Sequence, residues 1–449
     1  MDMTSGPVLK KMLAFTLPLM FSSILQLLFN AADIVVVGRF AGDDSLAAVG
    51  STTALVNLMT NLFMGLSVGT NVVCARYIGA GKDKSLSRAV HTSVMIGFIS
   101  GLVLTVVGFF GAKGLLQLMQ TPEEVLPLAT IYLKIYFFGM PAMMVYNFAA
   151  AILRAVGDTK RPLYYLFASG ILNVLLNLAF VIIFHMGVAG VALATIISQF
   201  MSAFLVIRCL MKETGAIKLI LRQLGIDKGI FFKIIQIGLP AGFQGIVFSL
   251  SNVVIQASVN GFGNVVVAGN SAAGNIEGFV WVAMNSFHQS TISFVSQNYG
   301  GEKYERINKI VITGLLCVFV TGAVLGNLCY IFGQPLLSIY SGSSKVIQAG
   351  MSRLSIISAT YAICGIMDVM VGALRGIGSS VVPMIVSVVG VCGLRLVWIG
   401  TIFQVEDFHR IETVYWSYPV SWILTFVAHS LCFIYLKHKM TKRLSEKNM

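Results

Sequence analysis

The chain has 449 residues, of which 57% are hydrophobic and only 11% are charged. An average soluble domain carries about 25% charged residues, and a soluble fold of this length could not bury so much apolar surface. The formal net charge of +13 would suggest nucleic-acid binding in a soluble protein. In a membrane protein it is explained by the enrichment of Lys and Arg in cytoplasmic loops, so we expect a lipid bilayer and no nucleic acid as partner.

Apolar runs of about 20–28 residues recur along the chain, each long enough to cross a hydrocarbon core of roughly 30 Å as a helix. The runs are continuous and do not alternate, which excludes a β-barrel. The first run is too long for a cleavable signal peptide, so we expect it to remain as the first membrane helix. The pattern predicts an all-α polytopic membrane protein with twelve helices, at 13–37, 46–75, 90–112, 125–152, 162–185, 188–211, 232–259, 267–297, 309–333, 346–372, 382–404 and 414–437.

The two halves of the chain share a motif. Residues 151–162 read AILRAVGDTKRP and residues 372–383 read GALRGIGSSVVP, so Leu-Arg-x-x-Gly and a proline recur after 221 positions. This spacing indicates two homologous halves, and six helices in each make them parallel copies around a central cleft. We predict two pseudo-symmetric six-helix lobes joined by a basic linker: an N-lobe at 1–211, a cytoplasmic linker at 212–231 and a C-lobe at 232–449.

The basic residues predict the orientation. Of the 31 Lys and Arg, 24 fall on the side of the two termini and only four on the opposite side. The positive-inside rule therefore places both termini in the cytoplasm. Within the linker, the stretch 218–224 is compatible with a short interfacial helix or with a plain tether.

Three carboxylates fall deep inside the predicted spans: Asp33, Glu277 and Asp368. An ionised side chain at that depth costs roughly 2.5–3.5 kcal/mol on insertion scales, so such residues are functional candidates.

The first carboxylate lies among polar residues of the N-lobe. Asn30 precedes Asp33 by three positions and shares its helix face, and Asn173 and Asn177 share a face of the fifth helix. With Thr195 of the sixth helix, these oxygens could form a cage for a monovalent cation, Na⁺ being possible at Asp33, Asn173 and Asn177. The desolvated carboxylate could instead carry a proton. The alternative is that the amides only bond helices together.

Two prolines, Pro18 and Pro240, lie early in the first helix of each lobe. A proline inside a helix removes a hydrogen bond, which favours either a hinge that moves or a static kink.

The C-lobe holds further polar candidates. Glu277 and Asn275 lie in a polar stretch of the eighth helix that is typical of a cleft lining. Glu277 could attract a cationic substrate or titrate, or it could form a buried ion pair with Arg395. Asp368 could bond within the C-lobe or complete a second ion-responsive site. Lys134 and Arg353 are expected to extend toward an interface.

Aromatic and Met side chains near the cleft, among them Tyr136, Met140 and Tyr146, could accept flat cations, although each is individually more typical of packing. The chain has no Walker A loop, zinc-type spacing or catalytic constellation. These features predict a protein that is not an enzyme and needs no cofactor.

The chain resembles the multidrug and toxic compound extrusion (MATE) family. The resemblance is carried by FNAADIVVVGRFAG (29–42), LAAVGS (46–51), AILRAVGDTKRP, LNVLLNL (172–178) and VGALRGIGSSVVP. It implies an antiporter of the plasma membrane, with transmembrane helices in two lobes that alternate in access. Such a protein exports cationic or amphipathic drugs and toxic organic compounds in exchange for Na⁺ or H⁺. A self-contained two-lobed cleft favours a monomer.

The resemblance also assigns residues. It places Asp33 at the coupling carboxylate of the N-lobe and Asn173, Asn177 and Thr195 at its cation-binding positions. Some family members carry Asp at the position of Asn177, so this site has one charge fewer.

A second family pattern needs carboxylates in the seventh and tenth helices. This chain has Gln244 and Cys364 there, with Asp368 one turn further on. This departure disfavours a sodium site in the C-lobe and favours the N-lobe.

The alternative function is a flippase for a lipid-linked saccharide or cell-wall precursor, as in related two-lobed families. A flippase needs a cationic cleft for a diphosphate, and only Arg395, Lys134 and Arg353 are candidates. An enzyme or a channel is a weaker reading, because the chain lacks a catalytic constellation and channels more often assemble as symmetric oligomers.

Overall fold

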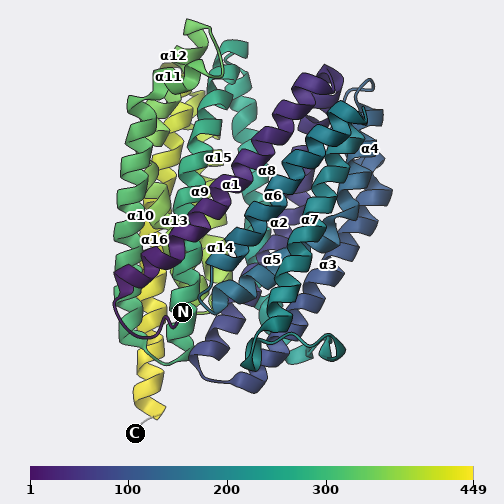
Figure 1. Cartoon of the computed structure of the whole chain (residues 1–449). Coiled ribbons are helices and arrows are strands. Elements are labelled where there is room, and N and C mark those ends of the chain that lie inside the picture. The colour runs from purple at the N-terminus through teal and green to yellow at the C-terminus, as the bar shows by residue number, and fades with distance from the viewer. Residues whose placement is uncertain (448–449) are drawn as a thin grey trace. The chain divides into compact units, whose positions relative to one another are not determined.

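The structure, a computed structural model, describes residues 1–447, and within these residues it is helical without strands (Figure 1). Residues 448 and 449, the end of the predicted C-lobe, lie outside the described residues. The α-helices are α1 Val8–Phe40, α2 Asp43–Gly79, α3 Asp83–Leu118, α4 Leu126–Phe138, α5 Met140–Ala155, α6 Lys160–Leu178, α7 Gly187–Lys212, α8 Lys228–Asn260, α9 Asn264–Gly300, α10 Tyr304–Ile331, α11 Gly333–Ser338, α12 Ser344–Arg353, α13 Tyr361–Gly376, α14 Val381–Ser387, α15 Leu394–Gly400 and α16 Ile411–Lys447.

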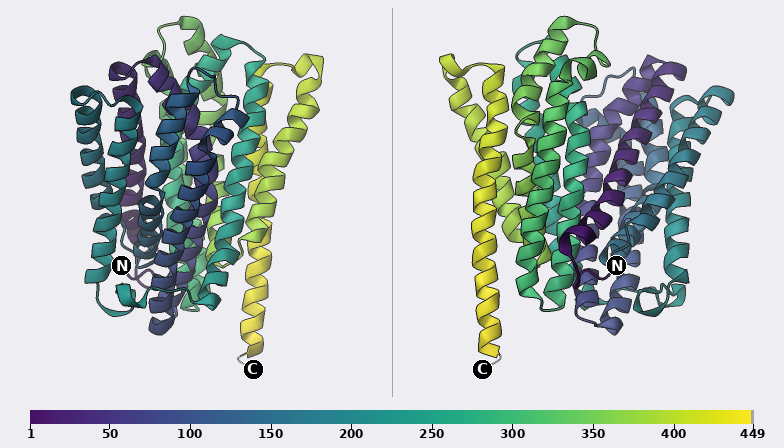
Figure 2. Two further views of the ribbon diagram at one scale, coloured as in Figure 1. Left: turned by 90° about the vertical axis from the view of Figure 1, so that its right-hand side faces the viewer. Right: turned by 60° about the vertical axis from the view of Figure 1, so that its left-hand side comes forward.

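The helices account for the predicted membrane spans. Among the described residues, nine helical segments are long and apolar enough to cross a membrane, and two bent pairs raise the number to eleven. The bent pairs are α4 with α5 and α12 with α13. The remaining long helix, α9, has 37 residues and is rich in Ser, Asn and Gln, which lowers its apolarity. The predicted all-α membrane architecture is confirmed, with α16 as one long helix that ends the chain (Figure 2).

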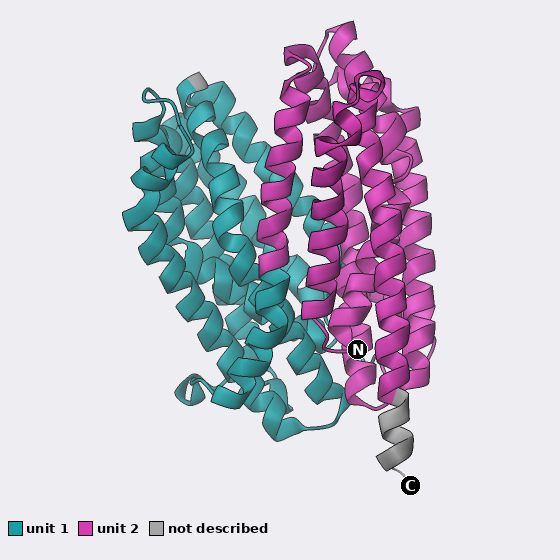
Figure 3. Ribbon diagram, turned by 180° about the vertical axis from the view of Figure 1, so that it is seen from behind, with its two compact units in different colours: residues 1–2, 17–242 teal, residues 3–16, 243–449 magenta. Residues whose placement is uncertain are grey.

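The chain packs as two compact units (Figure 3). Unit 1 contains residues 1–2 and 17–242, and unit 2 contains residues 3–16 and 243–449. Each boundary falls inside a long helix, so the first turns of α1 belong to unit 2 and the first half of α8 belongs to unit 1.

The sequence repeat is visible in the geometry of the helices. The helices α1 and α8 both have 33 residues, and α2 and α9 both have 37. The residues before α2 and α9 are Gly42 and Gly263, with φ of 89° and 88°, a region that favours glycine. The bent pairs correspond as well, with bends of 46° and 45°. Homologous sequence has therefore kept homologous backbone geometry.

The glycine of the repeated Leu-Arg-x-x-Gly motif ends a helix in both halves. Gly157 follows α5 with φ of 86°, and Gly378 follows α13 with φ of 85°. Their amides donate to the carbonyls of Arg154 at 2.9 Å and Arg375 at 2.8 Å. A left-handed glycine at this place satisfies carbonyls that the helix leaves open, which explains why the motif requires glycine.

The structure adds detail to four predicted elements. The spans expected at 125–152 and 346–372 as single helices are each bent. The span at 382–404 contains a π-helical segment, Val388–Gly393, between α14 and α15. The linker stretch 218–224 holds one 3₁₀ turn, Leu221–Gln223, and no longer helix. The tether alternative therefore holds, because no amphipathic helix forms there.

The linker is held against unit 1 by polar contacts. The amide of Ile220 donates to Nε2 of His91 at 3.0 Å, and the amide of Asp227 donates to Oγ1 of Thr92 at 3.1 Å. The carboxylate of Asp227 also pairs with Arg88 at 3.4 Å. A hydrogen bond from the amide of Ile230 lowers the pKa of Asp227, because it stabilises the ionised form.

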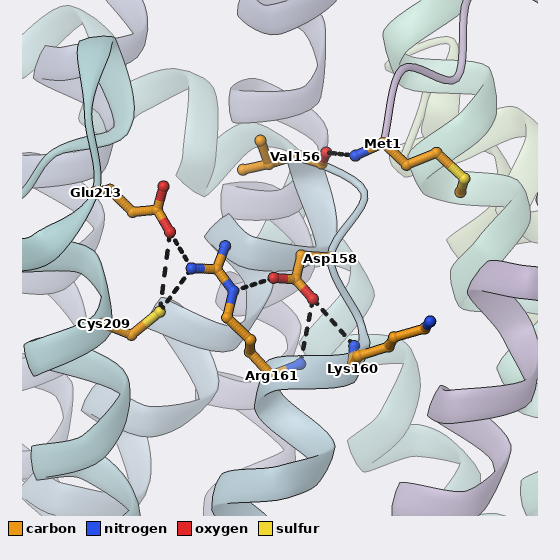
Figure 4. A network of polar contacts seen from close by, with 7 residues as sticks. All are labelled: Met1, Val156, Asp158, Lys160, Arg161, Cys209 and Glu213. Atoms are coloured by element: carbon orange, nitrogen blue, oxygen red, sulfur yellow. Dashed lines mark hydrogen bonds and ion pairs between the residues drawn. The ribbon is translucent and has the colours of Figure 1, made fainter.

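A second polar network joins the turn between α5 and α6 to the end of α7 (Figure 4). The guanidinium of Arg161 bonds to the carboxylates of Asp158 and Glu213 and donates to Sγ of Cys209 at 3.1 Å. The terminal amine of Met1 donates to the carbonyl of Val156 at 2.9 Å, which ties the start of the chain to the same turn.

Candidate functional site

The predicted cation-coupling residues come together in unit 1 from three helices. Asp33 lies on α1, Asn173 and Asn177 lie on α6, and Thr195 lies on α7. Asn173 and Asn177 face the same side because four residues make about one turn of helix. Residues 33 and 177, which are 144 positions apart in the chain, are in direct contact.

Hydrogen bonds connect these four side chains in a line. The amide nitrogen of Asn177 donates to the carboxylate of Asp33 and to Oδ1 of Asn173, the latter at 3.3 Å. The amide nitrogen of Asn173 donates to Oγ1 of Thr195 at 3.4 Å. The hydroxyl of Thr195 donates to the carbonyl of Val191 at 2.9 Å. The line fixes the orientation of both amides and of the hydroxyl.

The cluster retains oxygen atoms that are free to accept. Asn177 is 1% exposed, and its Oδ1 has no hydrogen-bond partner among the described residues. A buried acceptor without a partner costs about 1–3 kcal/mol. The carboxylate of Asp33 receives one side-chain hydrogen bond and has further lone pairs. The donor atoms of the cluster are carboxylate, amide and hydroxyl oxygens, the type of ligand that hard cations take.

Two cavities of unit 1 are lined in part by residues of this cluster. One has a volume of about 330 Å³ and the other of about 170 Å³. Asn30, Asp33, Tyr136 and Thr195 line both cavities. The candidate coupling carboxylate is thus accessible from two internal spaces, and three predicted site residues are adjacent to it. Tyr146 lines the larger cavity, and its hydroxyl donates to the carbonyl of Pro162 at 3.1 Å.

Met140 does not line either cavity. Its side chain is fully buried in the hydrophobic core of unit 1 together with Leu133 and Phe137. The prediction that Met140 lines a cleft is therefore wrong, because its side chain packs in the core and not against either cavity. The residue begins α5 directly after the bend between α4 and α5.

Several polar residues of the larger cavity were not predicted, Asn57 and Gln199 among them. Asn57 lies in the middle of α2, and Gln199 lies on α7. Gln199 follows Thr195 by four positions and so shares its helix face. Polar residues at helical spacing within an apolar run were the signal that could have identified them.

The carboxylate of Glu277 in unit 2 pairs with Arg353. The guanidinium donates to it from Nε at 3.1 and 3.2 Å and from Nη2 at 2.8 Å. Nη1 of Arg353 donates to Oδ1 of Asn270 at 2.6 Å, and Asn270 in turn donates to Gln256 at 3.1 Å. The expected pair of Glu277 with Arg395 is wrong, and so is the expectation that Arg353 extends to an interface. The end of α12 packs on α9, which brings Arg353 to Glu277 first.

Arg395 lies on α15 in a different setting. Its Nε donates to Oγ of Ser421 at 2.9 Å, and its guanidinium lies 4.0 Å from the centre of the Tyr418 ring. Arg395, Glu277 and Asp368 line a third cavity, of about 150 Å³, that lies wholly within unit 2.

The remaining C-lobe candidates do not join that cavity. Gln244 is buried, and its Oε1 accepts a hydrogen bond from Nη2 of Arg375 at 2.8 Å. Arg375 is the arginine of the second Leu-Arg-x-x-Gly motif, and this bond fixes the side chain of Gln244. Asn275 is exposed and faces away from the buried side of α9. Lys134 of unit 1 lies 5.2 Å from the centre of the Phe109 ring.

The two prolines lie inside unbroken helices. Pro18 is in the interior of α1 and Pro240 is in the interior of α8. The hydroxyl of Ser22 donates to the carbonyl of Pro18 at 2.9 Å, one turn further along α1. Their role as hinges stays a prediction.

The sequence profile of the MatE family matches residues 18–181 and 240–399. The chain therefore belongs to the MatE family, the multidrug and toxic compound extrusion transporters. The profile matches twice, beginning at the two prolines, in agreement with the internal repeat.

Several relatives match along most of the chain. It is 26% identical over 427 residues to the probable multidrug resistance protein YoeA of Bacillus subtilis, covering 93% of this chain and 92% of that protein. It is 22% identical over 442 residues to the multidrug export protein MepA of Staphylococcus aureus, covering 98% and 97%.

Solved structures share the fold. A MATE transporter in complex with MaL6 superposes with a TM-score of 0.91 at 21% identity, covering 98% of both chains. An outward-facing multidrug resistance MATE family transporter of the MOP superfamily superposes with a TM-score of 0.89 at 21% identity, again covering 98% of both chains.

Proposed function

We propose that this chain is a secondary active efflux antiporter. It exports cationic or amphipathic organic compounds, drugs among them, in exchange for Na⁺ or H⁺. Membership in the MatE family and the similarity to proteins named for multidrug resistance and export support this proposal. The protein acts as a monomer in the plasma membrane. Both termini lie in the cytoplasm, which the distribution of its basic residues favours.

The observation that carries the proposal is the cluster of Asp33, Asn177, Asn173 and Thr195, in which both asparagines are buried and the other two residues are half-buried. A carboxylate inside a membrane protein is expensive, and at this position it contacts amides and lines two cavities. A purely structural carboxylate would be expected to have a fixed cationic partner. The described residues offer Asp33 no ion pair, so a mobile cation is the partner that its position favours.

Coupling then follows from linkage. The ion and the exported compound must favour opposite conformations or compete for shared groups, and the ion gradient can shift the equilibrium only by that difference in binding. Asp33 and Thr195 line the same cavity as Tyr136 and Tyr146, so an ion at the carboxylate changes the surface that a cationic compound would contact. Binding of the ion bends α1 at Pro18 and contracts this cavity, which releases the compound outward.

The test is efflux of a fluorescent organic cation from vesicles, with Na⁺ and pH gradients imposed separately. Asp33→Asn is expected to abolish the acceleration by either gradient, because the amide is nearly isosteric but cannot balance a cation. Asp83→Asn is the matched control, since this carboxylate is exposed in the first turn of α3. Gradient-driven efflux at the wild-type rate in Asp33→Asn would exclude this coupling role.

A further inference from the structure

The cavity inside unit 2 is lined by aromatic and charged side chains. Its volume is about 150 Å³, and Trp281, Tyr361, Tyr418 and Trp422 contribute to its lining. A cavity of about this size is known to hold a benzene-sized ligand. The aromatic walls favour a ring, either by stacking or by edge contacts.

Arg395 provides a positive charge without a carboxylate partner. The residue is 5% exposed, yet the ion pairs among the described residues do not include it. Its Nε is bonded to Ser421 and its face lies on Tyr418, which leaves the edge that carries Nη1 and Nη2 for another acceptor. That edge is the fork by which a guanidinium binds a carboxylate with two hydrogen bonds.

Asp368 provides the opposite charge in the same cavity. Its backbone carbonyl is in hydrogen-bond contact with Nδ1 of His288 at 2.6 Å, but within the described part of the chain its carboxylate has neither a hydrogen bond nor an ion pair. Arg375, the cation of the same helix, donates its Nη2 to Gln244.

The other two charges of the cavity neutralise each other. Glu277 and Arg353 form an ion pair with side chains that are 4% and 13% exposed. They therefore attract neither a free anion nor a free cation strongly. The cavity as a whole presents one unpaired cation and one unpaired anion, which do not pair with each other, around a space bounded by rings.

We infer that this cavity binds a small aromatic zwitterion, with its carboxylate on Arg395, its cationic nitrogen at Asp368 and its ring against Tyr418 and Trp422. A simple cation would leave Arg395 unpaired, and a simple anion would leave Asp368 unpaired. A zwitterion satisfies both. Export of this ligand rests on the proposed function, whereas its binding in the cavity does not.

Calorimetric titration of the purified chain with three ligands of one skeleton tests the inference. L-Phenylalanine has both charges, phenethylamine lacks the carboxylate, and 3-phenylpropionate lacks the ammonium group. L-Phenylalanine is expected to bind at least about tenfold more tightly than either of the others, the factor that about 1.4 kcal/mol produces.

Variants assign the two charges. Arg395→Gln is expected to reduce the affinity for L-phenylalanine to that for phenethylamine, and Asp368→Asn to that for 3-phenylpropionate. Asp368→Asn is nearly isosteric, so it decides the question if Arg395→Gln fails to fold. Asp83→Asn, which changes an exposed carboxylate in the first turn of α3, is the control and should leave L-phenylalanine binding unchanged.

Equal affinity for the three ligands, or an unchanged affinity for L-phenylalanine in Asp368→Asn, would overturn the inference. The titration uses no gradient, so it is independent of transport. If the protein binds L-phenylalanine as expected but exports no fluorescent cation, the proposed function is refuted and the inference about the binding site is still supported.

Discussion

Removal of Arg353 should strongly destabilise the protein. Its guanidinium contacts both oxygens of Glu277 and also Asn270, and the carboxylate side chain is only 4% exposed. Arg353→Gln would leave a buried carboxylate without a cation. Breaking a buried pair in this way costs about 3–5 kcal/mol, and we expect a loss of that size in the free energy of unfolding.

A double-mutant cycle separates the pair from its surroundings. Replacing both partners, in Glu277→Gln with Arg353→Gln, removes the charges together and leaves two neutral amides. We expect this double variant to recover to within about 1–2 kcal/mol of the wild type, because neither charge remains uncompensated. Denaturant unfolding of the purified proteins in detergent, followed by tryptophan fluorescence, measures the three differences.

The exposed pair of Arg88 and Asp227 is the control. The side chain of Arg88 is 66% exposed, so Arg88→Gln should change the stability by less than about 1 kcal/mol. A loss below about 1 kcal/mol in Arg353→Gln, or a double variant as unstable as the two single losses added together, would refute the reasoning.

Two more predictions concern packing and pH. A methyl group at Gly65 would lie 2.2 Å from the backbone nitrogen of Gly242, so Gly65→Ala should lower the free energy of unfolding by about 1–3 kcal/mol. The control is Gly50→Ala on the same helix. The added methyl group meets nothing within 4 Å there, so this variant should be neutral or stabilising in the same unfolding assay. The lowered pKa of Asp227 means that its contribution to stability is complete above its ordinary value of 3.8 and is lost as the pH falls through the folded-state value. The difference in melting temperature between the wild type and Asp227→Asn should therefore shrink as the pH falls below 3.8, and a constant difference would contradict this.

Much of the fold could be predicted from the chain alone because its determinants are local. The length of each apolar run sets a membrane span, and the bilayer excludes most alternatives to helices. The repeated motif also predicted the correspondence between the halves, and the structure adds that its glycine has a left-handed backbone after both α5 and α13. The bends between α4 and α5 and between α12 and α13 were missed, because an apolar run that bends has the same composition as one that does not.

The candidate site was predictable in part. Asn173 and Asn177 share a face by helical spacing, and their contact with Thr195 and Asp33 is present in the structure. Their participation in ion coupling stays a prediction. The cavity residue Asn57 lies on α2, a helix that supplied none of the predicted site residues, so only packing brings it to the cavity of Asp33.

The amino-acid sequence by itself determined the medium, the helical content, the repeat and the presence of costly charges inside the membrane spans. Tertiary packing decided which of these charges meet. Glu277 pairs with Arg353 and leaves Arg395 to the ring of Tyr418, although both arginines lie within predicted spans. Hydropathy is a property of a single segment. The ion-pair partner of a charged side chain depends instead on the rotation and depth of each helix against its neighbours, and only the assembled bundle sets this rotation and depth.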